Sequence, residues 1–186
     1  MVCPWDDILA SIRGRESLLD IGCGHGLLLH LASKENPGMV LTGTDHDQNK
    51  IRIAKMSAEG DMTFINEEES DYLKDKSYDA ITLIDVLYSI PPEKWASILL
   101  MVRKHLKPGG RLIIKETVTS PRWKYYICLL QEIVAIKILK YTKGDSPNLP
   151  PSEFYIKQLK ENDFKIIEER RVDYYYIWPH HLFIAE

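Results

Sequence analysis

The sequence of 186 residues has few cysteines, little excess charge and no long apolar run. Its three cysteines form no C-x-x-C pair, so we expect neither a zinc site nor a disulfide framework, and reduced thiols predict a cytoplasmic protein. The formal net charge of −3 lacks the basic excess that is typical of proteins that bind nucleic acid. No window of about 18 uninterrupted apolar residues is present, so no segment is expected to span a membrane.

We also expect no secretory signal, because the N-terminal residues lack a basic segment followed by an apolar stretch. The sequence contains no internal repeat and no low-complexity segment, and its hydrophobic content of 45% is ordinary for a globular domain. A chain of this length most simply forms one core. The sequence therefore predicts a single domain over residues 1–186.

A glycine-rich turn follows the first predicted strand. Residues 18–21 predict a buried strand, residues 22–26 read Gly-Cys-Gly-His-Gly, and a helix is expected from Leu27. Glycine allows a positive φ and has no Cβ, so such a turn lets a nucleotide-bearing cofactor lie against the backbone. A dinucleotide-binding fingerprint would place its third glycine at position 27, which is a leucine here. The spacing therefore disfavours a nicotinamide dinucleotide.

Strands and helices alternate along the first two thirds of the sequence. Apolar runs predict further strands at residues 39–44, 62–65, 78–84 and 111–115. This alternation is typical of a parallel sheet with right-handed crossovers. Two final strands, 164–176 and 181–185, are joined by a connection too short for a crossover, so they should pair antiparallel. The sequence therefore predicts an α/β fold with a doubly wound, mostly parallel sheet and a C-terminal antiparallel hairpin.

Asp45 is a candidate ligand-binding residue because it lies at the carboxyl end of the second predicted strand. Ligands of open α/β sheets bind at this edge. Asp45 follows Gly22 by 23 residues, close to the spacing at which an acidic residue meets a ribose in nucleotide-binding βαβ units. A helix cap is the alternative role, but Asp47 is better placed to cap the helix that follows.

Several segments together resemble the motifs of class I S-adenosylmethionine (SAM) methyltransferases, and they occur in the same order. They are Asp20, the turn Gly22-x-Gly24-x-Gly26, the strand end 42–45 and the strand end 84–88. The last of these is most similar to small-molecule and quinone-type methyltransferases. The resemblance implies a Rossmann-like fold, SAM as the cofactor and S-adenosyl-L-homocysteine (SAH) as its product.

The resemblance assigns roles to the first two strand ends. The backbone N–H groups of residues 22–26 and the dipole of the following helix would receive the SAM carboxylate. Asp20 would organise this turn, meet the SAM ammonium, or simply cap the turn backbone. Asp45 would bond both ribose hydroxyls, and His46 would pack on the adenine or lie exposed.

Acidic residues later in the chain complete the implied cofactor site. Glu67 best matches the residue that accepts a bond from the adenine amino group, and Glu68 is next, although both could belong to a solvated acidic loop. Asp85 would hold the loop after the fourth strand or approach the ammonium. The Asn-Pro-Pro-Tyr signature of enzymes that methylate exocyclic amines is absent, which predicts a small, apolar or lipid-like acceptor rather than nucleic acid.

Methyl transfer to an oxygen acceptor also needs a group that removes the acceptor's proton. The candidates are Tyr88 beside the expected transfer centre, Glu116 at the end of the fifth strand, and His180 and His181 before the last strand. A histidine in a turn can equally be structural. No set of metal ligands is recognisable, so no metal is expected.

Residues 117–150 interrupt the alternation and predict a lid-like insert within the domain. Residues 121–141 predict a helix that is apolar on most of its circumference, with Arg122 and Lys124 at its start. A lid over an apolar acceptor, a homodimer contact, a peripheral membrane contact or a buried core position would each cover such a helix. As a lid or membrane contact, Arg122 and Lys124 would hold an anionic head group.

Two other functions are compatible with part of the pattern. A NAD- or nucleotide-binding oxidoreductase shares the strand, turn and helix, but Leu27 replaces its third glycine. A catalytically idle SAM-binding scaffold protein would retain the fold and the cofactor site without turnover.

Overall fold

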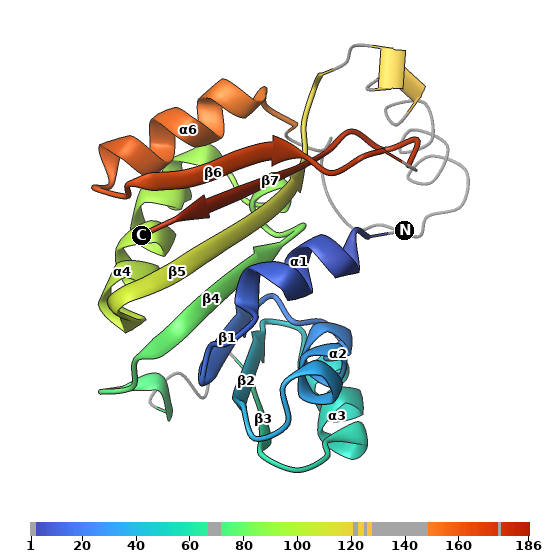
Figure 1. Ribbon diagram of the computed structural model, residues 1–186, viewed down its shortest axis with the longest axis vertical. Coiled ribbons are helices and arrows are strands. Elements are labelled where there is room, and N and C mark those ends of the chain that lie inside the picture. The colour runs from blue at the N-terminus through green and yellow to red at the C-terminus, as the bar shows by residue number, and fades with distance from the viewer. Residues whose placement is uncertain (1–2, 67–71, 121–122, 125, 128–148, 175) are drawn as a thin grey trace.

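The computed structural model describes residues 3–66, 72–120, 123–124, 126–127, 149–174 and 176–186. Within these ranges, a sheet of seven strands has the order β3-β2-β1-β4-β5-β7-β6 (Figure 1). The strands are β1 (Ser17–Ile21), β2 (Val40–Asp45), β3 (Met62–Asn66), β4 (Tyr78–Ile84), β5 (Leu106–Thr117), β6 (Ile166–Arg171) and β7 (His180–Ala185). Strands β1 to β5 pair in parallel, whereas β7 pairs antiparallel with both β5 and β6. The predicted α/β fold and its C-terminal antiparallel hairpin are confirmed.

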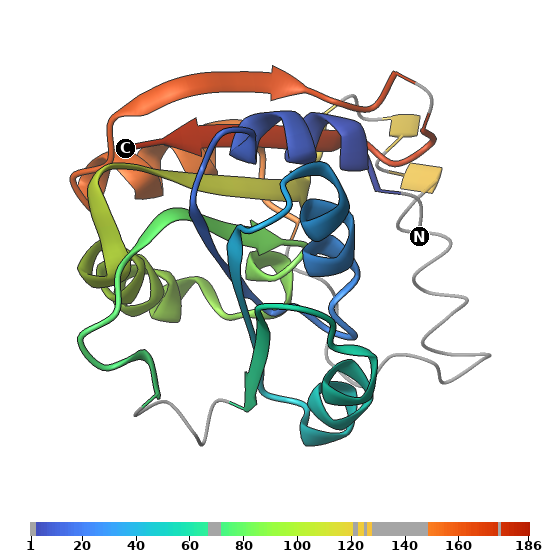
Figure 2. The same ribbon diagram turned by 60° about the horizontal axis from the view of Figure 1, so that its bottom comes forward.

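Helices cover both faces of this sheet (Figures 1 and 2). The bounds are α1 (Trp5–Ile12), α2 (Leu27–Glu35), α3 (Gln48–Ser57), α4 (Trp95–His105) and α6 (Ser152–Glu161), with the short 3-10 helices η2 (Leu87–Ser89) and η3 (Pro92–Lys94) before α4. The first three helices share one hydrophobic core with the sheet, and α4 and α6 share a second core on the opposite face. Every residue of β1 is buried, as expected where helices cover both faces of a strand.

The second core contains a column of aromatic rings that leads toward the carboxyl edge of the sheet. The ring of Tyr155 lies 5.0 Å from Trp95 and 5.3 Å from Phe183, measured between centroids. The ring of His181 continues the column, 4.8 Å from Phe183. Trp95 also donates its Nε1–H to the carbonyl of Ile90 at 3.0 Å, so the buried indole fixes the segment between β4 and α4.

Two strands differ in extent from the sequence-based prediction. β5 begins at Leu106, whose backbone pairs with Tyr78, and a register shift between Tyr78 and Ala80 accommodates the glycines that were expected to lie outside the strand. β6 ends at Arg171, before the predicted limit of residue 176. The reason is that β7 begins at His180, whose carbonyl accepts the Val172 N–H at 3.0 Å, and the pairing of the two strands ends at this bond.

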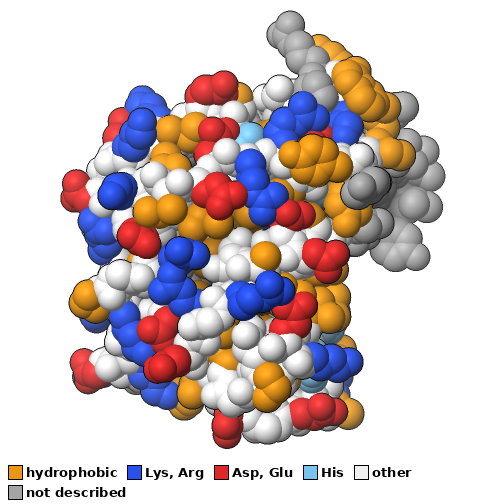
Figure 3. All heavy atoms as spheres, in the orientation of Figure 1, with side chains coloured by type: hydrophobic (Ala, Val, Ile, Leu, Met, Phe, Trp, Pro, Cys, Tyr) orange, Lys and Arg blue, Asp and Glu red, His pale blue; other side chains and the backbone are white. Residues whose placement is uncertain are grey.

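The face of the molecule in Figure 3 carries acidic and basic side chains intermixed rather than a patch of one sign. A broad basic surface is the usual electrostatic footprint of nucleic-acid binding. No helix in the described part of the chain is long and apolar enough to cross a membrane.

Most of the predicted insert, including Arg122 and the bulk of residues 121–141, lies outside the described residues. At its start, Lys124 is 8% exposed. Its Nζ donates to the carboxylate of Asp173 at 2.7 Å and to the carbonyls of Asp173 and Tyr176 at 3.0 and 2.6 Å. The prediction that Lys124 presents its charge to an anionic head group is therefore wrong, because a buried ammonium held by three oxygens anchors the insert to the β6–β7 connection.

Candidate functional site

The glycine turn after β1 closes onto the end of β2 through its own backbone. The N–H groups of Gly22 and Cys23 both donate to the carbonyl of Thr44, at 2.7 and 2.9 Å. The N–H of Gly24 donates to the Asp45 carboxylate at 2.9 Å. These N–H groups hold the turn together, whereas the sequence predicted that they would receive a ligand carboxylate.

The first turn of α2 remains available for that purpose. Gly26 is the N-cap of α2 and makes no side-chain cap bond, so no side chain caps the first N–H groups of the helix. Unsatisfied N–H groups and the positive end of the helix dipole favour a carboxylate.

Two of the turn's glycines need to be glycine for different reasons. Gly24 and Gly26 both have a left-handed φ, of 57° and 85°. A Cβ on Gly26 would lie 2.5 Å from the ring of Phe64, whereas a Cβ on Gly24 would have no atom of the described residues within 4 Å. Gly26 is therefore required by packing, and Gly24 borders open space. The structure thus has a backbone surface that a cofactor can approach closely, as the SAM hypothesis requires.

Asp45 lies at the end of β2, as the sequence predicted, and the residue is 3% exposed. One oxygen accepts the Gly24 N–H and the other accepts the N–H of Asp47 at 2.8 Å. A carboxylate oxygen has two lone pairs, so each can accept a further bond from a ligand hydroxyl. Asp47, not Asp45, caps α3, since its side chain accepts from the N–H groups of Asn49 and Lys50. The neighbouring His46 side chain is 78% exposed, and its Nδ1 lies 3.4 Å from Asp45 Oδ1.

Asp20 is 3% exposed and turns toward β4 rather than toward the glycine turn. Its Oδ1 accepts the Thr82 hydroxyl at 2.7 Å, so the interpretation of Asp20 as a cap of the turn backbone is wrong. Burial raises the pKa of Asp20 to about 7, the bond from Thr82 opposes this rise, and the charge of Asp45 adds to it. Asp20 therefore stays partly protonated near neutral pH and would gain its charge most readily beside a cation.

The segment after β4 is held by residues of β5. Asp85 has a left-handed φ of 54°, and its carboxylate accepts two bonds from the ammonium of Lys115, at 2.8 and 2.6 Å. The Glu116 carboxyl is fully buried, and its Oε1 accepts the N–H groups of Val86 and Leu87 at 2.9 and 2.7 Å. Burial, together with the nearby Asp85 charge, raises the pKa of Glu116 to about 8.

The remaining candidates for proton removal are mostly buried. Tyr88 is half-buried in η2. His180 is the first residue of β7, is fully buried and packs edge-on against the Tyr176 ring. His181 Nε2 lies 2.6 Å from a carboxylate oxygen of Glu169, and burial lowers the pKa of His181 despite that carboxylate. Glu67 and Glu68 lie outside the described residues.

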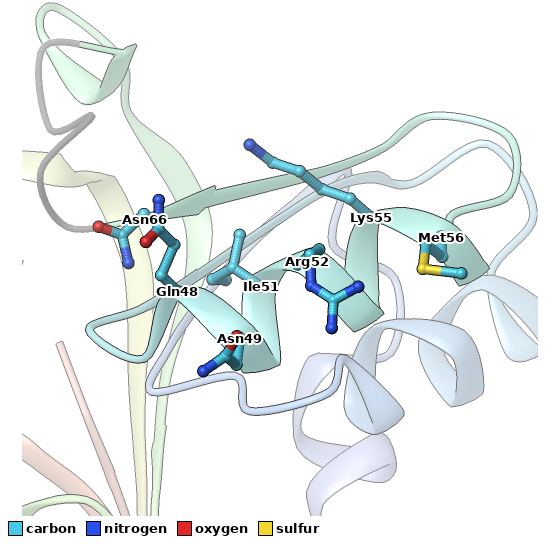
Figure 4. A pocket seen from close by; sticks show the side chains of 7 residues that line it. All are labelled: Gln48, Asn49, Ile51, Arg52, Lys55, Met56 and Asn66. Carbon is cyan, nitrogen blue, oxygen red and sulfur yellow. The ribbon is translucent and has the colours of Figure 1, made fainter.

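Asn66, which sequence reasoning did not select, ties the end of β3 to the end of β2. Its amide donates to the carbonyls of Asp45 and His46, at 3.1 Å each. It also lies at one end of a hollow along α3 together with Gln48, while Met56 lies at the other end (Figure 4). The hollow is lined by Gln48, Asn49, Ile51, Arg52, Lys55, Met56 and Asn66. It therefore lies beside α3 and is not the space bordered by Gly24.

The sequence patterns did not identify Lys115 and Thr82 as site residues either. Both lie in strands with many apolar residues, a pattern that predicts a buried core. A lysine inside an apolar strand is itself a signal, because a buried ammonium needs an acidic partner. No group of acidic, histidine and cysteine side chains with metal-binding geometry occurs in the described part of the chain.

Comparison with known proteins identifies the family. Residues 5–169 match a family model described as a methyltransferase domain. The chain therefore belongs to this family and is a class I SAM-dependent methyltransferase domain, with SAM as its cofactor. This result excludes the oxidoreductase interpretation.

Curated relatives include enzymes named for tRNA modification and enzymes named for ubiquinone biosynthesis. A tRNA N(3)-methylcytidine methyltransferase of Schizosaccharomyces pombe is 28% identical over 59% of this chain and 39% of its own length. Ubiquinone biosynthesis O-methyltransferases of Dechloromonas aromatica and Coxiella burnetii are 26% and 29% identical, over 80% and 77% of this chain and 64% and 61% of their own lengths. The chain thus spans less than two thirds of each of these relatives.

Solved structures share the fold. A SAM-dependent methyltransferase of Methanosarcina mazei has a TM-score of 0.73 at 23% identity, covering 96% of this chain and 95% of its own. Human N-acetylserotonin methyltransferase in complex with SAM has a TM-score of 0.72 at 21% identity, covering 98% of this chain and 51% of its own. At such identities the likeness concerns the fold.

Substitution by alanine should affect mainly stability at Gly26 and mainly SAH binding at Gly24. Gly26→Ala should destabilise the fold by about 2–4 kcal/mol, since its Cβ meets Phe64 and left-handed backbone adds strain. Gly24→Ala should cost only about 1–2 kcal/mol of strain but weaken SAH binding, because its Cβ enters open space at the edge. Thermal unfolding measures the change in stability, and calorimetric titration measures the change in SAH affinity. Equal loss of stability in the two variants would contradict this division.

Asp20 should make the fold less stable as pH rises. Its pKa is raised to about 7 in the folded protein, against a usual value of 3.8 for an aspartate, so the folded state holds a proton that the unfolded state releases from about pH 4. This contribution to stability is complete below about pH 4 and is lost as pH rises to about 7. Asp20→Asn removes it, so the melting temperature of the variant relative to wild type should increase between pH 5 and pH 8. A relative melting temperature that does not change with pH would refute the shift.

Proposed function

We propose that this domain binds SAM along the carboxyl ends of β1, β2 and β4 and transfers its methyl group to a small, apolar acceptor. The supporting observation is that Asp45 lies directly bonded to the Gly24 N–H, beside open space that a Cβ at Gly24 would enter. In this placement Asp45 bonds the ribose diol and the first turn of α2 receives the carboxylate. The bound cofactor supplies an electrophilic methyl group.

The other acidic residues would complete the cofactor site. Asp20 and Asp85 face the ammonium end, Asp20 through a charge that a neighbouring cation would stabilise. His46, largely exposed after Asp45, packs on the adenine. Glu67 and Glu68, which follow β3 in the sequence, remain candidates for the adenine amino group.

The acceptor class is supported by charge. The extent of the similarity does not separate the two kinds of relative, because ubiquinone-biosynthesis enzymes align over 80% and 77% of this chain and a tRNA N(3)-cytidine methyltransferase of Danio rerio aligns over 76%. The net charge of −3 and the intermixed charges of Figure 3 give no general attraction to an RNA backbone. We therefore favour a small molecule over nucleic acid.

In-line methyl transfer requires mainly that acceptor and cofactor are held aligned at near-contact distance. Of the candidate residues, Tyr88 is half-buried, whereas Glu116 and His180 are fully buried. Tyr88 is therefore proposed to contact the acceptor. His180 stays a candidate for proton removal.

The insert 117–150 is proposed as the cover of the acceptor site within a single domain of residues 1–186. Its start is fixed to the β6–β7 connection by Lys124, close in sequence to the strand that borders the site. Exposed apolar side chains at this start include Trp123 and Tyr126, each 60% exposed. A peripheral membrane contact or a homodimer through 121–141 would bury the same surface. We also propose a cytoplasmic location, because Cys3 and Cys23 are free thiols.

Asp45→Ala should weaken SAH binding by about ten- to hundredfold, because a charged bidentate contact to the ribose diol contributes about 1.5–3 kcal/mol. Calorimetric titration with SAH measures the change, and Asp61→Ala, which removes an exposed carboxylate before β3 at the opposite edge of the sheet, is the comparison. Binding within about twofold of wild type in folded Asp45→Ala would contradict the assignment.

Transfer of a labelled methyl group from SAM should be detected to a small hydrophobic phenol and not to unmodified tRNA. The purified chain is incubated with each acceptor, and Asp45→Ala serves as the inactive control. Labelled tRNA would overturn the acceptor class. Tight SAH binding with no transfer to either acceptor would favour the idle scaffold protein instead.

A further inference from the structure

The bend at residues 85–87, directly after β4, has an unfavourable backbone. Asp85 adopts a left-handed φ of 54°, which costs a residue other than glycine about 1–2 kcal/mol. Such a conformation persists only where the surroundings hold it, and it is enriched at functional sites. The N–H of Asp85 donates to the carbonyl of Lys115 at 2.9 Å, so the bend is attached to β5.

On one face of the sheet, Lys115 holds the first residue of the bend. Its side chain is fully buried, and its ammonium donates to both carboxylate oxygens of Asp85, at 2.8 and 2.6 Å. The cross-strand partner of Lys115 is Leu182, which belongs to the core of α1, α2 and α3. A buried ammonium without its carboxylate is costly, so this ion pair strongly favours the observed position of Asp85.

On the opposite face, Glu116 holds the next two residues. Successive side chains of a strand point to opposite faces, and the partner of Glu116 is His181, whose ring stacks on Phe183 in the core of α4 and α6. Glu116 Oε1 accepts the N–H groups of Val86 and Leu87. Lys115 and Glu116 therefore bond to the three residues of the bend from opposite faces of the sheet. Lys115 bonds to Asp85, and Glu116 bonds to Val86 and Leu87.

We propose that Lys115 and Glu116, here termed the β5 clamp, are positioning residues that preset the bend 85–87 for cofactor binding. They touch neither the cofactor nor the acceptor and act through Asp85, Val86 and Leu87. The inference rests on the proposed function, which places the methionine part of SAM along the end of β4. Without the clamp, the bend would sample other conformations and would have to be ordered when the cofactor binds, which lowers affinity.

The test compares SAH affinity and amide hydrogen exchange in the full chain. Lys115→Met removes the ammonium, and Glu116→Asp keeps the acid but withdraws it from the Val86 and Leu87 N–H groups by one methylene. Each variant should bind SAH about tenfold more weakly. The amides of residues 85–87 should exchange at least about tenfold faster, while amides in the centre of β1 keep their protection.

The chain offers a matched control for each variant. Lys107 pairs with Asp79 at 2.8 Å, between the same two strands but at the opposite edge of the sheet, so Lys107→Met breaks a partly exposed lysine–aspartate bond away from the bend. It should leave SAH affinity within about twofold. Glu116→Gln retains an oxygen that can accept both N–H groups and should restore binding to within about threefold.

The outcomes separate the clamp from the cofactor site itself. Unchanged SAH affinity in folded Lys115→Met and Glu116→Asp would overturn the clamp, as would an equal loss in Lys107→Met. If Lys115→Met does not fold, the SAH affinities of Glu116→Asp and Glu116→Gln are compared instead. Equal affinity in these two variants would also overturn the clamp. If Asp45→Ala weakens SAH while the clamp variants do not, the placement of the cofactor stands and only the clamp fails. If Asp45→Ala has no effect either, the proposed site is wrong.

Discussion

The contact between the glycine turn and the end of β2 is the constraint on which the rest of the site depends. Backbone N–H groups of residues 22–24 bond to Thr44 and Asp45, so two strand ends that are distant in sequence become one surface. This closeness needs a strand without a side chain at Gly43, where a Cβ would lie 2.8 Å from the Cys23 sulfur. Glycines on both sides of the contact therefore create the edge at which a cofactor can lie.

The carboxyl edge of the sheet contains several buried carboxyl groups, and their burial changes their pKa values. Asp20 and Glu116 are each buried, and burial raises their pKa values to about 7 and about 8. Such groups hold protons near neutrality, so the edge avoids accumulating several buried negative charges. These groups lower the stability of the fold near neutral pH, because the folded chain binds protons there that the unfolded chain would release. A cation that binds beside these carboxyl groups would favour their charged form.

Local patterns were enough to predict much of the fold and part of the site. Strand alternation, the glycine turn and the acid at the end of β2 depend on residues close in sequence, and the structure contains each of them where predicted. Contacts between side chains of different strands were not predictable in the same way. The Lys115 bond to Asp85 depends on register between β4 and β5, and the Asn66 bonds depend on β3 reaching as far as Asp45. Single-sequence patterns do not specify such pairings.

The place of β7 in the sheet has a consequence for how the chain reaches its fold. β7 is made after β6 but lies between β6 and β5, with backbone bonds to both. During synthesis, the edge of β5 therefore stays unpaired until residues 180–185 have left the ribosome. An open apolar strand edge is a site of aggregation. The parallel half of the domain can assemble early, but it remains vulnerable until the hairpin closes against it.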